Sequence, residues 1–100
     1  MAKLVVREKD GEFIVSGDRT AVRQFEDAAR IGTYTKDGLV INYKAMAKLR
    51  GVPPSRMRST VLRYIKENIR AVKAHYSWHG KQLKVRIIVR QKRRRRKSQR

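Results

Sequence analysis

The chain has 100 residues, no cysteine and a net charge of +19, from 27 Lys and Arg against eight Asp and Glu. This length suits one domain with a modest core, and the absence of cysteine excludes disulfides, thiol chemistry and cysteine zinc sites. No apolar run approaches the ~20 residues of a membrane span, so we expect a cytoplasmic protein without a membrane partner.

Positive charge is concentrated in one part of the chain. Residues 1–37 hold seven basic and seven acidic residues, whereas the remainder holds 20 basic residues and a single acid, Glu67. A charge restricted to one segment indicates that this segment faces a polyanion. We therefore predict one nucleic-acid-binding domain over residues 1–90. It comprises a neutral platform at 1–37 and a basic unit at 38–90, and a basic tail at 91–100 follows it.

Residues 3–16 are predicted to form a β-hairpin, which a helix follows. Two runs of β-forming residues flank Asp10-Gly11, which is a strong signal for a tight turn. Asp18 is positioned to cap a helix over residues 19–31, and Gly32 ends that helix. These elements make up the neutral platform.

The stretch after Asp37-Gly38 begins with a short buried strand at residues 39–41. Residues 43–50 then fit a short helix capped by Asn42, because apolar residues recur there at helical spacing and Lys, Ala, Met and Leu are good helix formers. A hairpin over the same residues is the alternative that the sequence leaves open.

The strongest helical pattern covers residues 55–70. It follows a break at residues 51–54, and Pro54 suits the first turn of a helix because its missing N–H costs nothing there. The apolar residues of this helix recur every four positions, at Met57, Val61, Ile65 and Ile69.

A second hairpin is predicted for residues 72–89. Apolar and polar residues alternate over 72–78 and again after the turn at His79-Gly80. Tyr76 and Trp78 belong to the apolar row and are expected to pack in the core, although Trp78 and His79 at the tip are the better candidates for stacking on bases. The polar face of this hairpin carries Lys73, His75, Lys84, Arg86 and Arg90.

Helix–turn–helix spacing links the two central helices. The small residue, turn glycine and two core anchors of that motif are matched by Ala47, Gly51, Val52 and Met57. With the hairpin after them these helices resemble a winged helix, from which Arg50 and Thr60 depart because their positions are usually apolar. A plain helical hairpin without a role in groove reading is the alternative.

The predicted fold class is therefore α+β. An N-terminal β-hairpin and helix are followed by a winged-helix-like helix–turn–helix plus β-hairpin, and a disordered basic C-terminal tail completes the chain.

Candidate nucleic-acid contacts are basic, histidine and hydroxyl side chains of the basic unit and the tail. At ~100° per residue, Arg56, Arg63 and Arg70 form a stripe opposite the apolar face of their helix, where guanidinium groups can bind phosphates or guanine edges. A solvated basic face is the alternative, but such a face normally includes several acids. The predicted contacts are Lys48, Arg50, Ser55, Arg56, Arg58, Ser59, Arg63, Lys66, Arg70, Lys73, His75, His79, Lys81, Lys84, Arg86, Arg90, Lys92, Arg93, Arg94, Arg95, Arg96, Lys97 and Arg100.

Catalysis has little support in the sequence. The basic segment has one carboxylate, which allows neither an acid–base pair nor an acidic metal cage, and it has no glycine-rich phosphate loop. His75 and His79 lie four residues apart, but on a strand they share one face and have no third ligand nearby. We expect no enzymatic activity, no metal, no cofactor and no small-molecule substrate.

From Gly38 onwards the chain resembles the eukaryotic-type large-subunit ribosomal protein twenty-two, one of the small basic ribosomal proteins. The similar features are the strand start Gly38-Leu39-Val40-Ile41, the helix opening Val52-Pro53-Pro54-Ser55-Arg56 and the strand Val85-Arg86-Ile87-Ile88-Val89. The chain differs from that family in two respects, because the family has an acidic C-terminal tail and a hairpin at the position of residues 43–50. The resemblance implies a place in the ribosome.

We expect a ribosomal protein that binds structured ribosomal RNA through the helix stripe, the hairpin face and the tail. A charge of +19 exceeds what sequence discrimination requires, and competing genomic sites penalise such non-specific affinity in a regulator. The alternative is a winged-helix protein that binds double-stranded DNA, either as a transcription regulator or as an architectural, nucleoid-associated protein. Neighbouring proteins are a further candidate partner, through residues 1–37.

Overall fold

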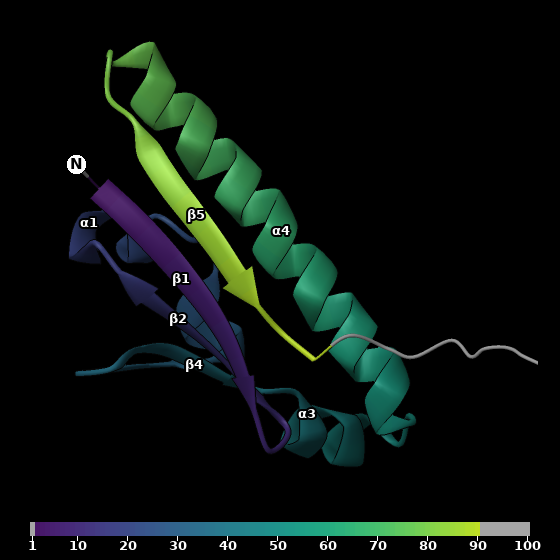
Figure 1. Ribbon diagram of the computed structural model, residues 1–100. Coiled ribbons are helices and arrows are strands. Elements are labelled where there is room, and N and C mark those ends of the chain that lie inside the picture. Colours follow the sequence, from purple (N-terminus) through teal and green to yellow (C-terminus); the bar gives the residue numbers. More distant parts are fainter. Residues whose placement is uncertain (1, 91–100) are drawn as a thin grey trace, which may run out of the picture.

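A five-stranded mixed sheet with four helices makes up the fold of residues 2–90, which are the residues that this computed structural model describes. The strands are β1 (Ala2–Lys9), β2 (Glu12–Gly17), β3 (Thr33–Thr35), β4 (Gly38–Asn42) and β5 (Leu83–Ile88). The helices are α1 (Arg19–Arg23), α2 (Ala28–Ile31), α3 (Tyr43–Arg50) and α4 (Pro54–Trp78). The predicted α+β class is confirmed, and α4, with 25 residues, is the longest element (Figure 1).

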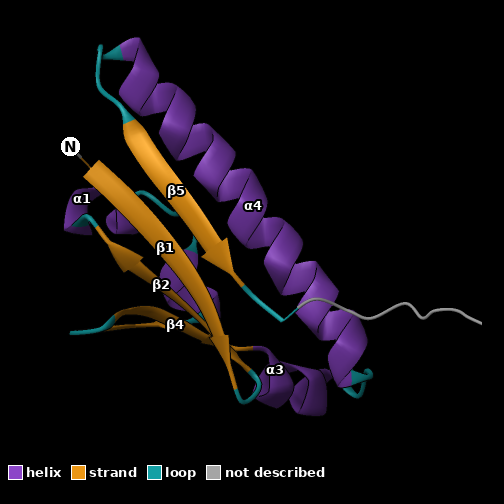
Figure 2. Ribbon diagram, in the orientation of Figure 1, coloured by secondary structure: helices purple, strands orange, loops and turns teal. Residues whose placement is uncertain are grey.

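The sheet is antiparallel except at one pair of strands. Its order is β3-β4-β2-β1-β5, and β5 pairs with β1 in parallel. A parallel neighbour has to be reached by a long connection rather than a tight turn. The chain accordingly leaves the sheet after β4, passes through α3 and α4, and returns as the edge strand β5, alongside which α4 runs (Figure 2).

The β1–β2 hairpin forms as predicted because its turn residues adopt left-handed conformations. Asp10 and Gly11 have φ of 45° and 86°, which is typical of a two-residue type I′ turn, and Lys9 pairs with Glu12. Gly17 ends β2 with φ of 121°, and a Cβ at that position would lie 2.2 Å from the carbonyl oxygen of Lys3. Glycine is therefore required where these two strands come closest.

One face of the sheet carries the core. The buried strand residues alternate along their strands and are Leu4, Val6, Phe13, Val15, Leu39, Ile41 and Leu83. The longest helix adds one apolar row, which consists of Met57, Val61, Ile65, Ile69, Val72 and Tyr76. Buried residues from all four helices join these strand residues in a single cluster. Because strand side chains alternate between faces and the helices of residues 2–90 pack on this face, they leave the other face of the sheet uncovered.

The platform helix predicted over residues 19–31 is wrong in one respect, because it is two short helices. Asp27 interrupts it with a left-handed φ of 57°. The neighbouring backbone of Glu26 is bonded to α4, since its N–H donates to Oδ1 of Asn68 at 2.8 Å and its carbonyl accepts from the hydroxyl of Tyr64 at 2.6 Å. Contacts with α4 thus satisfy backbone groups that a continuous helix would bond internally.

Asp18 precedes α1 as predicted, but its side chain does not cap the helix. Its carboxylate instead accepts a hydrogen bond of 2.8 Å from the hydroxyl of Tyr76, near the C-terminal end of α4. The residue therefore joins the platform to α4.

The helix predicted for residues 43–50 is confirmed, and the hairpin alternative is wrong. Asn42 caps α3, because its side-chain oxygen accepts a hydrogen bond of 2.8 Å from the N–H of Ala45. Gly51 ends the helix in a left-handed conformation with φ of 66°.

The strand predicted for residues 72–78 is wrong, because these residues continue α4 to Trp78. Val72 and Tyr76 follow Ile65 and Ile69 at spacings of three and four, so they extend the buried row of the helix. The alternation of apolar residues at every second position was coincidental. Trp78, expected in the core, is 86% exposed.

The predicted winged helix therefore lacks the β-hairpin that would form its wing. Residues 83–88 do form the predicted second strand, but this strand pairs with β1 rather than with residues 72–78. The strand β3, which was not predicted, pairs antiparallel with β4. The predicted disordered tail at 91–100 lies outside the described residues.

Candidate nucleic-acid interface

The outer face of α4 is a stripe of exposed cations. Its core row packs on the sheet, so the residues on the opposite side of the helix face away from the sheet. Arg56 and Arg70 are 14 residues apart, which corresponds to ~21 Å along the helix axis. The outer stripe consists of the exposed residues Arg56, Ser59, Arg63, Lys66 and Arg70, as predicted, and the acid Glu67 is exposed beside them.

No carboxylate of residues 2–90 forms an ion pair with this stripe. Within residues 2–90 there is one salt bridge, between Arg58 and Glu8, and it lies on the inner side of the helix. The guanidinium groups of the outer stripe are thus available to an external anion, and their mutual repulsion would be relieved by one.

Arg58, which the sequence placed among the nucleic-acid contacts, is engaged inside the fold. Its Nε and Nη2 donate to the two carboxylate oxygens of Glu8 at 2.7 and 2.8 Å, and Nη2 also donates to the carbonyl of Arg90. The guanidinium carbon lies 5.8 Å from the ring centroid of Phe13. We therefore remove Arg58 from the candidate interface.

Glu8 is the centre of a polar cluster that joins four segments. Besides Arg58, the hydroxyl of Tyr43 and the N–H of Arg90 donate to its carboxylate at 2.7 and 2.9 Å. The hydrogen bonds from Arg58 and then from Tyr43 and Arg90 outweigh the effect of burial and lower the pKa of Glu8 from 4.5 to about 2. This Glu8 cluster (Glu8, Tyr43, Arg58 and Arg90) joins β1, α3, α4 and the segment after β5, and it holds α4 in position.

The turn between α3 and α4 carries three further predicted contacts. Lys48, Arg50 and Ser55 are all exposed, at the end of α3 and the start of α4. Arg50 lines a hollow with Glu26 and Asp27 of the platform and Glu67 of α4, so acids lie near its charge.

The C-terminal end of α4 presents a second group of predicted contacts. Lys73, His75, His79 and Lys81 are exposed there beside Trp78. The rings of His75 and His79 lie 4.6 Å apart between centroids, as helical neighbours rather than on one face of a strand. No cluster of three potential metal ligands occurs in residues 2–90. The exposed indole of Trp78 retains its predicted suitability for stacking on a base.

The open face of the sheet carries two more predicted contacts, together with two that the sequence reasoning missed, and the predicted contact Arg90 is exposed just after β5. Lys84 and Arg86 are exposed on β5, and the pairing with β1 places Lys3 and Arg7 on the same face. Alternation along β1 signals that these two residues share a face, but the parallel pairing that brings them beside β5 has no local signal. This part of the platform surface is therefore basic, although residues 1–37 have equal numbers of basic and acidic residues.

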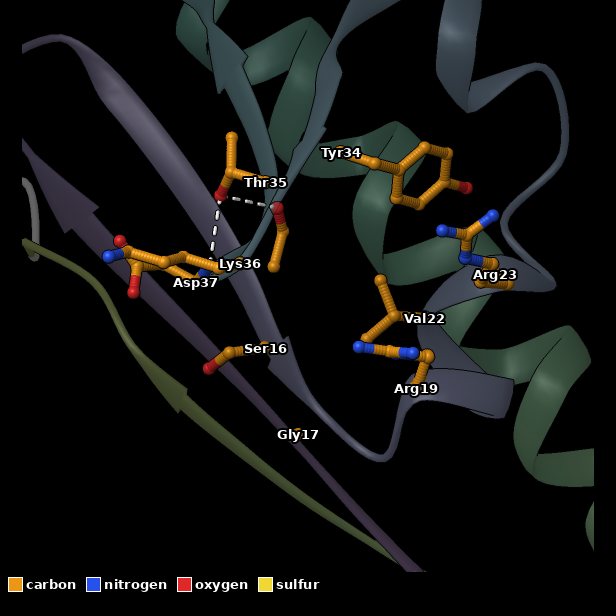
Figure 3. Close-up of a pocket in the computed structure, with 10 residues that line it drawn as sticks. Ser16, Gly17, Arg19, Val22, Arg23, Tyr34, Thr35, Lys36 and Asp37 are labelled. Atoms are coloured by element: carbon orange, nitrogen blue, oxygen red, sulfur yellow. Dashed lines mark hydrogen bonds between the residues drawn. The ribbon is translucent and has the colours of Figure 1, made fainter.

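A second cationic corner of the platform was also missed. Arg19 and Arg23 of α1, Tyr34 of β3 and Lys36 line a hollow of about 400 Å³ at the edge of the sheet (Figure 3). The guanidinium of Arg23 lies 4.9 Å from the ring centroid of Tyr34, within the range of a cation–π interaction. Asp37 lies at the same hollow and offsets part of its charge.

In comparisons with known proteins, no protein-family model, curated protein or solved structure matches this chain. Across residues 2–90, no helix combines the length and the hydrophobicity that crossing a membrane requires. The predicted tail contacts Lys92, Arg93, Arg94, Arg95, Arg96, Lys97 and Arg100 lie outside the described residues.

Proposed function

We propose that the protein is a non-catalytic binder of structured RNA, with ribosomal RNA as its expected partner. The observation that carries this proposal is the outer stripe of α4. It places three arginines and a lysine on one exposed helix face beside a single acid, and none of them forms an internal ion pair in residues 2–90.

The stripe suits the backbone of a nucleic acid rather than an isolated anion. Arg56, Arg63 and Arg70 recur every seven residues, so they are spaced ~10 Å apart along the helix. Each guanidinium can donate two parallel hydrogen bonds to a phosphate. Duplex RNA is recognised mainly through its phosphates, its 2′-hydroxyls and its shape, and a rigid row of cations fits that mode of binding.

The rigidity of α4 supports the same proposal. The Glu8 cluster holds the N-terminal half of the helix, and Tyr64 and Tyr76 bond it to the platform at 2.6 and 2.8 Å. A surface that is ordered before binding loses less conformational entropy on association, so more of the interaction energy is retained as affinity. The basic tail adds seven cations in sequence and extends this electrostatic attraction.

The first test is the salt dependence of binding to a short RNA duplex. If about eight phosphates are neutralised, the logarithm of the association constant should fall with the logarithm of salt concentration with a slope near −7. The triple variant Arg56→Gln, Arg63→Gln, Arg70→Gln should make that slope shallower by about 3 and leave the melting temperature unchanged. The charge-matched control is Lys9→Gln, Arg30→Gln, Lys44→Gln, which removes three exposed cations outside the candidate surfaces.

A wild-type slope shallower than about −2 would contradict phosphate neutralisation as the basis of binding. An equal effect of both triple variants would show that total charge, rather than the stripe, determines affinity.

Binding of double-stranded DNA is the second candidate, and one observation favours it. α3 and α4 are joined by a tight turn at Gly51, which is left-handed as a helix–turn–helix motif requires, although the wing strand is replaced by helix. Titration of RNA and DNA duplexes of the same sequence distinguishes the two functions.

Sedimentation in a lysate provides the cellular test. The RNA proposal predicts that the protein migrates with a ribosomal subunit and is released by RNase alone. Release from chromatin by DNase alone would replace it with the DNA-binding function.

A further inference from the structure

The uncovered face of the sheet carries four basic residues on the neighbouring strands β1 and β5. Lys3 and Arg7 project from β1 and Lys84 and Arg86 from β5, and all four residues are exposed. Strands lie ~4.8 Å apart and alternate residues on one strand ~7 Å apart, so these four cations occupy one compact patch, the sheet patch.

The register of β1 and β5 is electrostatically unfavourable without a ligand. Lys3 lies directly opposite Lys84, and Arg86 opposite Val5 sits between Lys3 and Arg7. Like charges that face each other across two strands are destabilising. The one acid of this face, Glu12, pairs in register with Lys9 at the end of the hairpin and lies outside the patch.

The sheet patch and the outer stripe face opposite directions. α4 packs its apolar row on the covered face of the sheet, so its outer stripe faces away from one side of the molecule and the sheet patch from the other. Between them lies a two-layer body whose shortest dimension is 20 Å. A short RNA duplex is stiff on this length scale and cannot contact both surfaces at once.

We propose that the sheet patch is a second phosphate-binding surface and that the protein bridges two RNA segments, one on α4 and one on the sheet. This inference rests on the proposed function of α4. The apolar neighbours on the same face, Val5 and Ile88, add no negative charge to the patch. Ile88 is 47% exposed beside Arg7.

Energy transfer between two RNA duplexes tests the proposal. One 16-base-pair duplex carries a donor dye and a second carries an acceptor, and both are mixed with the full-length protein at less than one protein per pair. Bridging predicts energy transfer and a sedimenting complex of one protein with two duplexes. Duplex alone and duplex with excess protein provide the references.

Two variants, one that removes four cations from the sheet patch and one that removes three from the outer stripe, separate the surfaces. The quadruple variant Lys3→Gln, Arg7→Gln, Lys84→Gln, Arg86→Gln should bind one duplex, lose the energy transfer and keep its melting temperature. The triple variant of the outer stripe (Arg56→Gln, Arg63→Gln, Arg70→Gln) should likewise bind a single duplex, on the sheet. The control Lys9→Gln, Arg30→Gln, Lys44→Gln, at exposed cations outside these surfaces, should retain both duplexes.

Each other outcome overturns a defined part of this inference. A wild-type complex with a single duplex would exclude bridging, and persistent energy transfer in the quadruple variant would assign the second site to the tail or elsewhere. If the patch instead serves an acidic protein, the variant will bind RNA with unchanged stoichiometry and affinity. Failure of the wild type to bind any duplex would contradict the proposed function itself, which is a distinguishable result.

Discussion

The inner and outer sides of α4 use arginine in opposite ways. On the inner side, Arg58 is bonded to Glu8, which Tyr43 and Arg90 hold in place. On the outer side, Arg56 and its neighbours in the stripe face solvent. All of these arginines belong to the same basic helix, so the net charge of the helix does not show which of them can bind a ligand. A cation is therefore available to a ligand only where the fold has not already placed an ordered carboxylate beside it.

Removing the inner guanidinium should produce the largest change. Arg58→Met leaves the Glu8 side chain, which is 5% exposed, without its main partner. We expect a loss of about 3 kcal/mol in the free energy of unfolding, because an uncompensated buried charge is strongly destabilising. Denaturant unfolding measures this loss. The control Arg56→Met, two residues away on the outer side, should change the same quantity by less than ~0.5 kcal/mol.

Lowering the pH should reduce the free energy of unfolding by a similar amount, because it removes the charge of Glu8 on the inner side of α4. Hydrogen bonds from Arg58 are the main reason that the pKa of Glu8 is about 2 in the folded protein, against 4.5 ordinarily. The unfolded chain therefore takes up the proton first, so this stabilisation is complete above pH 4.5 and is lost as the pH falls towards 2. The shift corresponds to about 3 kcal/mol.

The measurement is the free energy of unfolding between pH 6 and 2 for the wild type and for Glu8→Gln. Other carboxylates titrate in both proteins, so the difference between the two profiles isolates Glu8. That difference should shrink as the pH falls through this window. Parallel profiles would show that Glu8 is not the group that couples proton binding to folding.

Local signals sufficed for much of the fold. The Asp10-Gly11 turn, the cap at Asn42 and the four-residue spacing from Met57 to Ile69 each specify a short segment, and each predicted element formed. The parallel pairing of β5 with β1 could not be read in this way, because it joins strands more than 70 residues apart. The break in the platform helix likewise depends on Tyr64 and Asn68 of another element.

The candidate site likewise has a part that local sequence signals predict and a part that depends on long-range contacts. The exposure of Arg56, Arg63 and Arg70 follows from helical periodicity, which the sequence contains. The commitment of Arg58 to Glu8 does not, since it requires knowing which strand passes beneath the first turns of α4. Sequence periodicity identifies the side of a helix that faces the core, but the partner there is set by tertiary structure.

A smaller effect should come from the second bond that holds the inner side. Tyr76→Phe removes the hydroxyl that donates to Asp18 at 2.8 Å and retains the buried ring. We expect a loss of about 1.5 kcal/mol, the usual contribution of a hydrogen bond to a charged group. Asp18→Asn and the double variant complete a mutant cycle, and strictly additive effects would show that the two side chains do not interact.

The smallest expected effect distinguishes helix from strand at residues 72–78. On a strand, Trp78 would share a face with Tyr76 and pack in the core, and truncating it would cost about 3–5 kcal/mol. On the helix it is 86% exposed, so Trp78→Ala should change the free energy of unfolding by less than ~0.5 kcal/mol. Tyr76→Ala, at a buried position two residues earlier, should be strongly destabilising in either arrangement. A large loss for both variants would restore the hairpin, whereas a large loss for Tyr76 alone would place Trp78 on the exposed side of α4, free to stack on RNA.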